Sequence, residues 1–193
     1  MKYVLATANQ GKIAEIRDAL MAAGIETLTR SELGIDMDIE ETGTTFLENA
    51  TLKARAVCEA AGLPAIADDS GLMVEALDGD PGVYSSSYGG ETLNDSERYR
   101  FLIKMMEGVE QRRAKFVCTI VCVYPDGGVI SAQGECVGEI LAAPRGSGGF
   151  GYDPVFLIDN TDKTMAELSV EQKNAISHRG KAVREFVSML SNR

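Results

Sequence analysis

Residues 2–24, KYVLATANQGKIAEIRDALMAAG, decide how the fold begins. The apolar run over 2–7 predicts a buried β-strand because polar residues and a glycine follow it. Residues 12–23 repeat apolar side chains on one helical face, and Gly24 then ends the predicted helix. A strand, a turn containing Asn and Gly, and a helix form a common opening for an α/β nucleotide site, because backbone N–H groups at the helix start face the turn.

Beyond this opening, predicted helices and strands follow one another along the chain. Residues 125–128, PDGG, separate two long β segments and predict a hairpin. Because α/β elements are combined with this antiparallel hairpin, we expect a mixed β-sheet flanked by helices, in two lobes with a central cleft. Helices are predicted over 46–61, 96–107, 170–177 and 180–191, and strands over 65–67, 72–76, 114–124, 129–140 and 155–157.

The composition narrows the classes of function. The 193 residues, 45% hydrophobic and 25% charged, predict one globular domain over 1–193. The net charge of −10 argues against nucleic-acid binding, which normally needs a basic face. No apolar run approaches the roughly 20 residues of a membrane helix. With no recognisable secretory leader, and four cysteines in no zinc-ligand pattern, we expect free thiols, a cytoplasmic location and no membrane partner.

Two adjacent acids, Asp68 and Asp69, follow the apolar segment 65–67 and precede Ser70 and Gly71. Neighbouring residues at a strand end place one side chain on each face of the sheet. Like charges this close are costly unless a cation lies nearby. Mg²⁺ is the usual cation, because it is held by few carboxylates together with phosphate oxygens and waters. The alternative interpretation is a turn formed by Asp and Gly.

A second polar set surrounds the start of the predicted helix over 46–61. Asn49 and Lys53 are four residues apart and share a helix face. Glu48 matches a capping box with Thr45. Glu41 lies in the preceding loop, where its carboxylate could reach a metal or could simply be a solvated acid.

The turn 7–12 is a candidate triphosphate cradle. Thr7 and Asn9 offer hydrogen bonds, Gly11 permits close backbone approach and Lys12 adds a cation. The P-loop pattern G-x-x-x-x-G-K-[ST] is absent. An ordinary strand–helix turn is the alternative.

Aromatic rings stand among glycines in the loop 144–154. Phe150 or Tyr152 could stack on a nucleotide base while Asp153 or loop amides contact its edge. The alternative is a turn whose rings fill the core. Further along, His178 and Arg179 precede Gly180, which breaks the helical pattern and favours a functional role for both; a surface charge is the default for Lys173.

Taken together, these motifs resemble the inosine triphosphate pyrophosphatase family of the dITP/XTP type, which clears deaminated purine nucleotides. They occur in the family's order from residue 7 to residue 180, and one departure is Ala8, where many members carry Gly or Ser. The matching stretches are TANQGK at 7–12, ETGTTFLENA at 41–50, ADDSGL at 67–72, GGFGYDP at 148–154 and SHRG at 177–180.

The resemblance implies an elongated α/β fold with two lobes, a homodimer and a Mg²⁺ cofactor. It implies that Asp69 is the catalytic proton acceptor and a metal ligand, with Glu41 as a second metal ligand. It also implies two groups of residues that bind substrate. The phosphates would be held by Thr7, Ala8, Asn9, Gln10, Gly11, Lys12 and Ser70. The rest of the substrate, mostly at the base end, would be held by Phe150, Gly151, Tyr152, Asp153, Lys173, His178 and Arg179.

The predicted reaction is hydrolysis of a non-standard purine nucleoside triphosphate (dITP/ITP or XTP/dXTP) to the monophosphate and pyrophosphate. Mg²⁺ and Lys12 would screen phosphate charge while Asp69 takes the proton of the attacking water or orients metal and water. Donors from Lys173, Arg179 or loop amides would pair with the 6-oxo group and be left unpaired by adenine. Two alternatives stay open: a house-cleaning pyrophosphatase for other modified nucleotides, and a nucleotide-sensing module without turnover.

Overall fold

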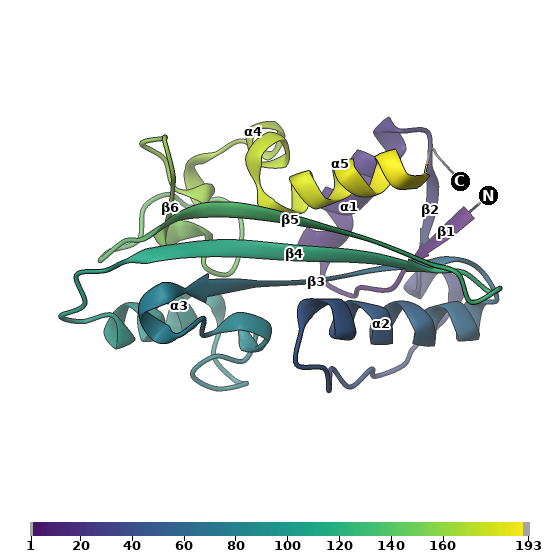
Figure 1. Cartoon of the computed structure of the whole chain (residues 1–193), viewed down its shortest axis with the longest axis horizontal. Helices are drawn as coiled ribbons and strands as arrows, with labels where there is room; N and C mark the ends of the chain where they lie inside the picture. Colours follow the sequence, from purple (N-terminus) through teal and green to yellow (C-terminus); the bar gives the residue numbers. More distant parts are fainter. Residues whose placement is uncertain (1, 191–193) are drawn as a thin grey trace. The chain divides into compact units, whose positions relative to one another are not determined.

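A computed structural model describes residues 2–190 of the chain as a six-stranded sheet with helices packed against it (Figure 1). The strand order is β2-β1-β3-β4-β5-β6. The strands are β1 (Lys2–Leu5), β2 (Glu26–Thr29), β3 (Ala65–Val74), β4 (Arg113–Val123), β5 (Val129–Ile140) and β6 (Phe156–Ile158), and the α-helices are α1 (Gln10–Ala22), α2 (Phe46–Ala61), α3 (Asp95–Met105), α4 (Val170–Ile176) and α5 (His178–Leu190).

The sheet is mixed, as the sequence predicts. Strand β1 pairs in parallel with β2 and with β3, because α1 and α2 supply the crossovers that parallel strands require. At the other edge, β5 and β6 pair antiparallel. The predicted α/β class, a mixed sheet flanked by helices, is confirmed.

The chain divides into two compact units, and the division falls inside three strands. The first unit comprises residues up to Asp69, Cys118–Gly134 and the segment from His178 onward. The second comprises Ser70–Val117 and Glu135–Ser177.

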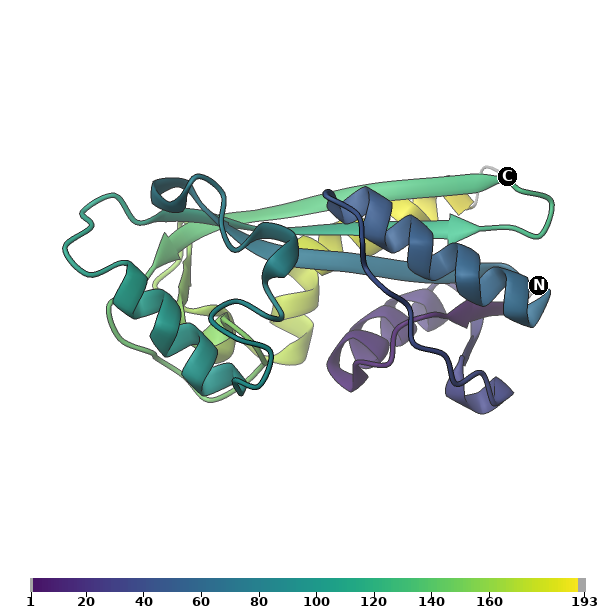
Figure 2. The ribbon, with the colours of Figure 1, turned by 90° about the horizontal axis from the view of Figure 1, so that it is seen from below.

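In the first unit, α1 and α5 pack together on one face of the strands and α2 lies on the other (Figures 1 and 2). The side chains of β3 alternate between these two cores. Ile66 packs among residues of α1 and α5, whereas Ala65 and Ala67 pack against Ala54 and Val57 of α2. Successive residues of β3 therefore face opposite sides of the sheet. By the same alternation, Asp68 faces the side of α1 and α5, and Asp69 faces the side of α2.

The core of the second unit joins the far part of β3 to α3 and to the loop before β6. Leu72 packs in one cluster with Leu102 of α3, and the rings of Phe116 and Phe156 lie with their centroids 4.6 Å apart. Strands β5 and β6 approach closely at Gly138, where an added Cβ would lie 2.1 Å from the carbonyl oxygen of Leu157. This core supports the glycine-rich loop over residues 144–154.

The structure corrects the expectation that the strand ends just before the two adjacent acids. Strand β3 is continuous over ten residues, so Asp68 and Asp69 lie inside the strand and not at its end or in a turn. The two residues are 0% and 6% exposed. The strand can continue through both acids because each carboxylate forms an ion pair on its own face of the sheet, Asp68 with Lys12 and Asp69 with Lys53. These ion pairs offset the repulsion between the two adjacent negative charges.

Candidate active site

Asp69 points toward α2 and forms a cluster with three residues from that side of the strands, here called the Asp69 cluster (Glu41, Asn49, Lys53 and Asp69). Lys53 Nζ lies 3.1 Å from Asp69 Oδ1 and 2.8 Å from Glu41 Oε2. Asn49 Nδ2 donates to Asp69 Oδ2 at 3.4 Å, and its Oδ1 accepts from the backbone N–H of Gly43 at 2.8 Å. The spacing of four along α2 brings Asn49 and Lys53 to the same carboxylate.

The surroundings of Asp69 disfavour its negatively charged form. Burial, together with the neighbouring Glu41, raises the pKa of Asp69 to about 6, even though Lys53 and Lys12 act in the opposite direction. The pKa of Lys53 is also raised, because Asp69, Asp68 and Glu41 together outweigh the effect of its burial. An additional cation near Asp69 and Glu41 would therefore be favourable.

The Asp69 cluster fits a hard divalent cation. Two carboxylates, from Glu41 and Asp69, lie within reach of the same lysine ammonium, and Glu41 is partly open to solvent. Mg²⁺ typically takes one or two protein carboxylates and completes its shell with waters and phosphate oxygens. Over residues 2–190, no group of three or more His, Cys, Asp or Glu side chains lies together as a closed metal cage. Two carboxylates match the number of protein ligands with which Mg²⁺ is usually held.

Asp68 points to the opposite face, into what we call the Asp68 cluster (Lys12, Glu15, Asp68 and Arg179). Its Oδ2 lies 3.0 Å from Lys12 Nζ and 3.4 Å from Arg179 Nε. Arg179 also forms an ion pair with Glu15 through Nη1. Asp68 therefore has a cation from α1 and a cation from α5.

The turn 7–12 is shaped by its own side chains. Asn9 caps α1, with Oδ1 accepting from the backbone N–H of Lys12 at 3.1 Å, and Thr7 Oγ1 accepts from the N–H of Asn9 at 3.2 Å. Gln10 Nε2 reaches the carbonyl of Ala8 at 3.5 Å. The exposed turn thus presents the first backbone N–H groups of α1 next to Lys12, which is the arrangement that binds anions.

The second unit carries the Phe150 cluster (Phe150, Asp153 and Lys173). Lys173 Nζ lies 2.7 Å from Asp153 Oδ2 and 4.6 Å from the centroid of the Phe150 ring. Asp153 Oδ2 also accepts from the backbone N–H of Phe150 at 3.0 Å. Gly149 has φ +72°, and a Cβ there would lie 2.0 Å from Asp153 Oδ2, so only glycine permits this loop conformation. Lys173 is buried, which corrects the default expectation of a surface charge.

The two rings of the loop differ in their surroundings. Tyr152 is buried and donates its hydroxyl to the carbonyl of Ser85 at 2.8 Å, so this ring fills the core. Phe150 is only partly buried and lies beside Lys173. Gly151 is held by its N–H, which donates to Asp95 Oδ2 at 2.7 Å.

The remaining predicted residues fall at two places. Ser70 lies in β3, partly buried, directly after Asp69. His178 is buried at the first turn of α5, where β5 approaches so closely that a Cβ on Gly134 would lie 2.2 Å from the His178 carbonyl oxygen. His178 and Arg179 belong to the first unit, whereas Lys173 belongs to the second.

Some residues that contact the predicted site residues were not themselves predicted. Glu15 and Asp95 carry no recognisable signal in the sequence, because a single acid on a helix is ordinarily a solvated charge. Asn49 and Lys53 do carry one, since their helical spacing places both on one face. Glu48 serves the predicted capping box, accepting from the backbone N–H groups of Thr44 and Thr45.

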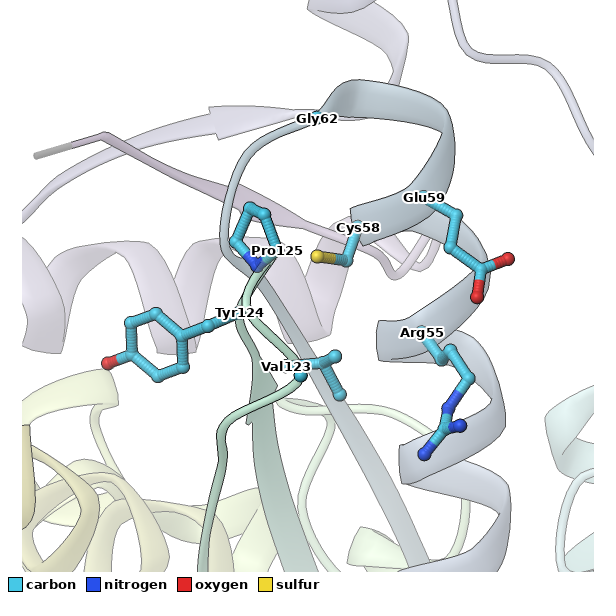
Figure 3. A pocket seen from close by; sticks show the side chains of 8 residues that line it. Arg55, Cys58, Glu59, Gly62, Val123, Tyr124 and Pro125 are labelled. Atoms are coloured by element: carbon cyan, nitrogen blue, oxygen red, sulfur yellow. The ribbon is translucent and has the colours of Figure 1, made fainter.

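A pocket of about 330 Å³ lies elsewhere in the first unit (Figure 3). It lies between the C-terminal end of α2 and the turn that joins β4 to β5, and it contains none of the predicted site residues. Its lining residues are Arg55, Cys58, Glu59, Gly62, Val123, Tyr124, Pro125 and Gly127.

With this geometry in place, comparison with known proteins decides the family. The model of the Ham1 family matches residues 3–189. The chain belongs to the Ham1 family. Among its relatives, the dITP/XTP pyrophosphatases of Aquifex aeolicus and Thermus thermophilus are each 51% identical to it, over 100% and 97% of this chain and 98% and 90% of their own lengths.

Solved Ham1 structures share the fold of this Ham1-family chain. The Coxiella burnetii HAM1 protein superposes with a TM-score of 0.92 at 41% identity, covering 100% of both chains. The Staphylococcus aureus Ham1 protein gives 0.90 at 43% identity, over 100% of this chain and 99% of its own. The resemblance drawn from the five motifs is confirmed. Within residues 2–190, no helix has the length and apolar character needed to cross a bilayer.

Proposed function

We propose that this chain hydrolyses non-standard purine nucleoside triphosphates, the dITP/ITP and XTP/dXTP class, to the monophosphate and pyrophosphate with Mg²⁺ as cofactor. The observation that carries the proposal is the buried Asp69 carboxylate with Glu41 and Lys53 around it. Relatives about 50% identical over nearly the whole chain are named dITP/XTP pyrophosphatases, which supports the same reaction here.

The Asp69 cluster would perform the hydrolytic step. Glu41 and Asp69 would hold Mg²⁺, which when bound supplies positive charge at the phosphates and at the departing pyrophosphate. Asp69 orients the attacking water and accepts its proton, a role typically worth about 10²–10⁴ in rate. Asn49 and Lys53 keep the Asp69 carboxylate in one orientation.

The turn 7–12 and Lys12 would bind the phosphates. Lys12 and the first N–H groups of α1 offer positive charge and donors to an anion. Ser70 follows Asp69 directly and would add a hydroxyl donor. Positive charge aimed at the reacting phosphate is often the largest catalytic contribution.

The Phe150 cluster would recognise the base. Phe150 stacks on the purine ring, and Lys173 donates to the 6-oxo group that inosine and xanthine carry. Asp153, already bound to Lys173, fixes the direction of that donor. Adenine has a 6-amino group, which cannot accept a hydrogen bond from the ammonium, so adenine would forgo the contact that a 6-oxo group makes, and the loss of such a buried polar contact strongly disfavours the wrong substrate.

A panel of triphosphates with product identification tests the proposal. Purified protein with Mg²⁺ should release pyrophosphate, and not orthophosphate, from ITP and XTP far faster than from ATP or GTP. Release at equal rates from all four would refute the selectivity, and release of orthophosphate would refute the reaction.

The same panel separates the two alternatives. A pyrophosphatase for other modified nucleotides would prefer a pyrimidine or another altered base over ITP and XTP. A sensing module would bind ITP saturably and release no pyrophosphate over hours. The Asp69 cluster favours an enzyme, because binding phosphates alone does not require a carboxylate pair suited to a metal.

We also propose that the protein is a cytoplasmic homodimer, which follows from the family resemblance. Light scattering during gel filtration should give twice the mass of the 20.7 kDa chain. A monomer at micromolar concentration would refute it.

A further inference from the structure

Asn49, a buried member of the Asp69 cluster, uses both ends of its side-chain amide. The residue is 2% exposed. Its Oδ1 accepts from the backbone N–H of Gly43 at 2.8 Å, and its Nδ2 donates to Asp69 Oδ2 at 3.4 Å. A backbone N–H can only donate, so it fixes which end of the amide is the oxygen and leaves the NH₂ group facing the carboxylate. Asn49 therefore joins the loop before α2 to strand β3 through one planar group.

The loop that carries Glu41 is attached to the first turn of α2 at three consecutive backbone N–H groups. Glu48 accepts from those of residues 44–45, at 2.7 and 3.1 Å, and Asn49 accepts from that of Gly43. Glu41 lies only two residues before the first of these bonds. The start of α2 therefore determines where the Glu41 backbone lies, and Asn49 makes the bond nearest to it.

Gly43 allows this loop to lie directly against the Asn49 amide. A Cβ at this position would lie 2.6 Å from the Cβ of Glu48 and 2.7 Å from Asn49 Oδ1. Both distances are shorter than non-bonded atoms tolerate, so any larger residue would displace the loop from Asn49. Glycine is needed here for close approach of the backbone.

A second link between Glu41 and Asp69 is of a different kind. Lys53 Nζ pairs with both carboxylates, at 2.8 and 3.1 Å. A divalent cation held by the same carboxylates would repel the ammonium, so this link weakens when a metal binds. The Asn49 amide carries no net charge, and its bonds to Gly43 and Asp69 face no such repulsion. Asn49 is therefore the link whose strength does not depend on the metal.

We propose that Asn49 is a positioning residue that fixes the spacing of the Glu41 and Asp69 carboxylates and makes the site select Mg²⁺ over the larger Ca²⁺. Mg²⁺ requires nearly ideal octahedral geometry with bonds of about 2.0–2.1 Å, whereas Ca²⁺ accepts irregular shells at about 2.3–2.6 Å. Carboxylates held at a fixed spacing favour Mg²⁺, and loosened ones lose Mg²⁺ more than Ca²⁺. This inference rests on the proposed function, which assigns Mg²⁺ to these two carboxylates.

Calorimetric titration with Mg²⁺ and with Ca²⁺, each in the absence of nucleotide, measures this selectivity. Asn49→Ala should raise the Kd for Mg²⁺ about tenfold or more, as the loss of a residue that holds a metal ligand typically does. The Kd for Ca²⁺ should rise by a smaller factor, so the preference for Mg²⁺ falls. An unchanged Kd for Mg²⁺, or equal weakening for both cations, would overturn the proposal.

Gly43→Ala tests the same link from the side of the loop. It leaves Asn49, Glu41 and Asp69 unchanged but displaces the backbone that Asn49 holds, so it should reduce the preference for Mg²⁺ as Asn49→Ala does. Glu59→Ala truncates an exposed side chain in the last turn of α2, and this control should keep both wild-type Kd values. Circular dichroism identifies the folded variants, and a wild-type preference in folded Gly43→Ala would overturn the proposal even if Asn49→Ala does not fold.

The metal requirement of turnover separates positioning from general damage to the fold. In Asn49→Ala, the Mg²⁺ concentration that gives half-maximal release of pyrophosphate from ITP should rise about tenfold. The KM for ITP at saturating Mg²⁺ should stay unchanged. A raised KM with an unchanged Mg²⁺ requirement would overturn the proposal.

The wild-type protein distinguishes failure of this inference from failure of the proposed function. If it binds Mg²⁺ in preference to Ca²⁺, and Asn49→Ala loses that preference, the positioning role stands even if no triphosphate releases pyrophosphate; only the proposed reaction is then refuted. A wild-type protein that binds neither cation would refute both the positioning role and the assignment of Mg²⁺ to this site.

Discussion

The two faces of β3 give adjacent aspartates opposite environments. Asp68 meets two cations, Lys12 and Arg179, and is sealed from solvent. Asp69 has one cation, Lys53, and an acid beside it, and burial raises its pKa to about 6. The difference teaches that a buried carboxylate paired with two cations organises other side chains. One left short of positive charge is suited to a metal ion and a proton.

The largest expected effect falls on catalysis at Asp69. Asp69→Asn should lower kcat for ITP by about 10²–10⁴, because a positioned base and a metal ligand are both lost. The protein should remain folded, as circular dichroism would show. Asp18→Asn, which changes an exposed acid on α1, is the control. Turnover within tenfold of wild type would erase the distinction between the two faces.

The second effect falls on stability at Asp68. Asp68→Asn should lower the free energy of unfolding by about 3–5 kcal/mol, since it leaves the buried Arg179 with one partner fewer. Urea unfolding measures this loss. Asp69→Asn should show no such loss in the same assay at neutral pH. Equal losses for the two variants would show that both faces have the same structural role.

A smaller effect separates the two acids by pH in metal-free buffer. The pKa of Asp69 is raised from 3.8 to about 6, so the folded protein binds a proton that the unfolded chain has released. Stability owed to this group is therefore lost as the pH rises from about 4 through 6. Asp69→Asn should match wild type near pH 4 and exceed it by up to about 3 kcal/mol near pH 7.5. Urea titrations at several pH values measure the difference, and a gap that does not grow with pH would contradict the assignment.

The smallest effect is the response to Mg²⁺ alone. At ten times its dissociation constant, a ligand stabilises the folded state by about 1.4 kcal/mol. Mg²⁺ should raise the melting temperature of wild type and leave that of Asp69→Asn nearly unchanged. Glu41→Gln should reduce the response, because Glu41 is the second carboxylate of the cluster. A full response in Asp69→Asn would place the metal elsewhere.

Much of the fold was predictable because local patterns agree with the final structure. The helix over Phe46–Ala61 and its capping box at Thr45 are confirmed to the residue, since capping and apolar spacing are both local. The strand through Asp68 and Asp69 was not predicted. Two acids in a row normally argue against a buried strand, and only partners from other elements make it stable.

The candidate site likewise has features that local sequence patterns specify and features that depend on contacts between distant elements. The sequence by itself determined that Asp68 and Asp69 point to opposite faces, because side chains alternate along a strand, and that Asn49 and Lys53 share one face of a helix. Only the tertiary structure decided which cation meets which acid. Arg179 reaches Asp68 across 111 residues of sequence, and Glu15 joins them because α1 and α5 pack together. Such pairings depend on how helices pack on a sheet, which no local periodicity specifies.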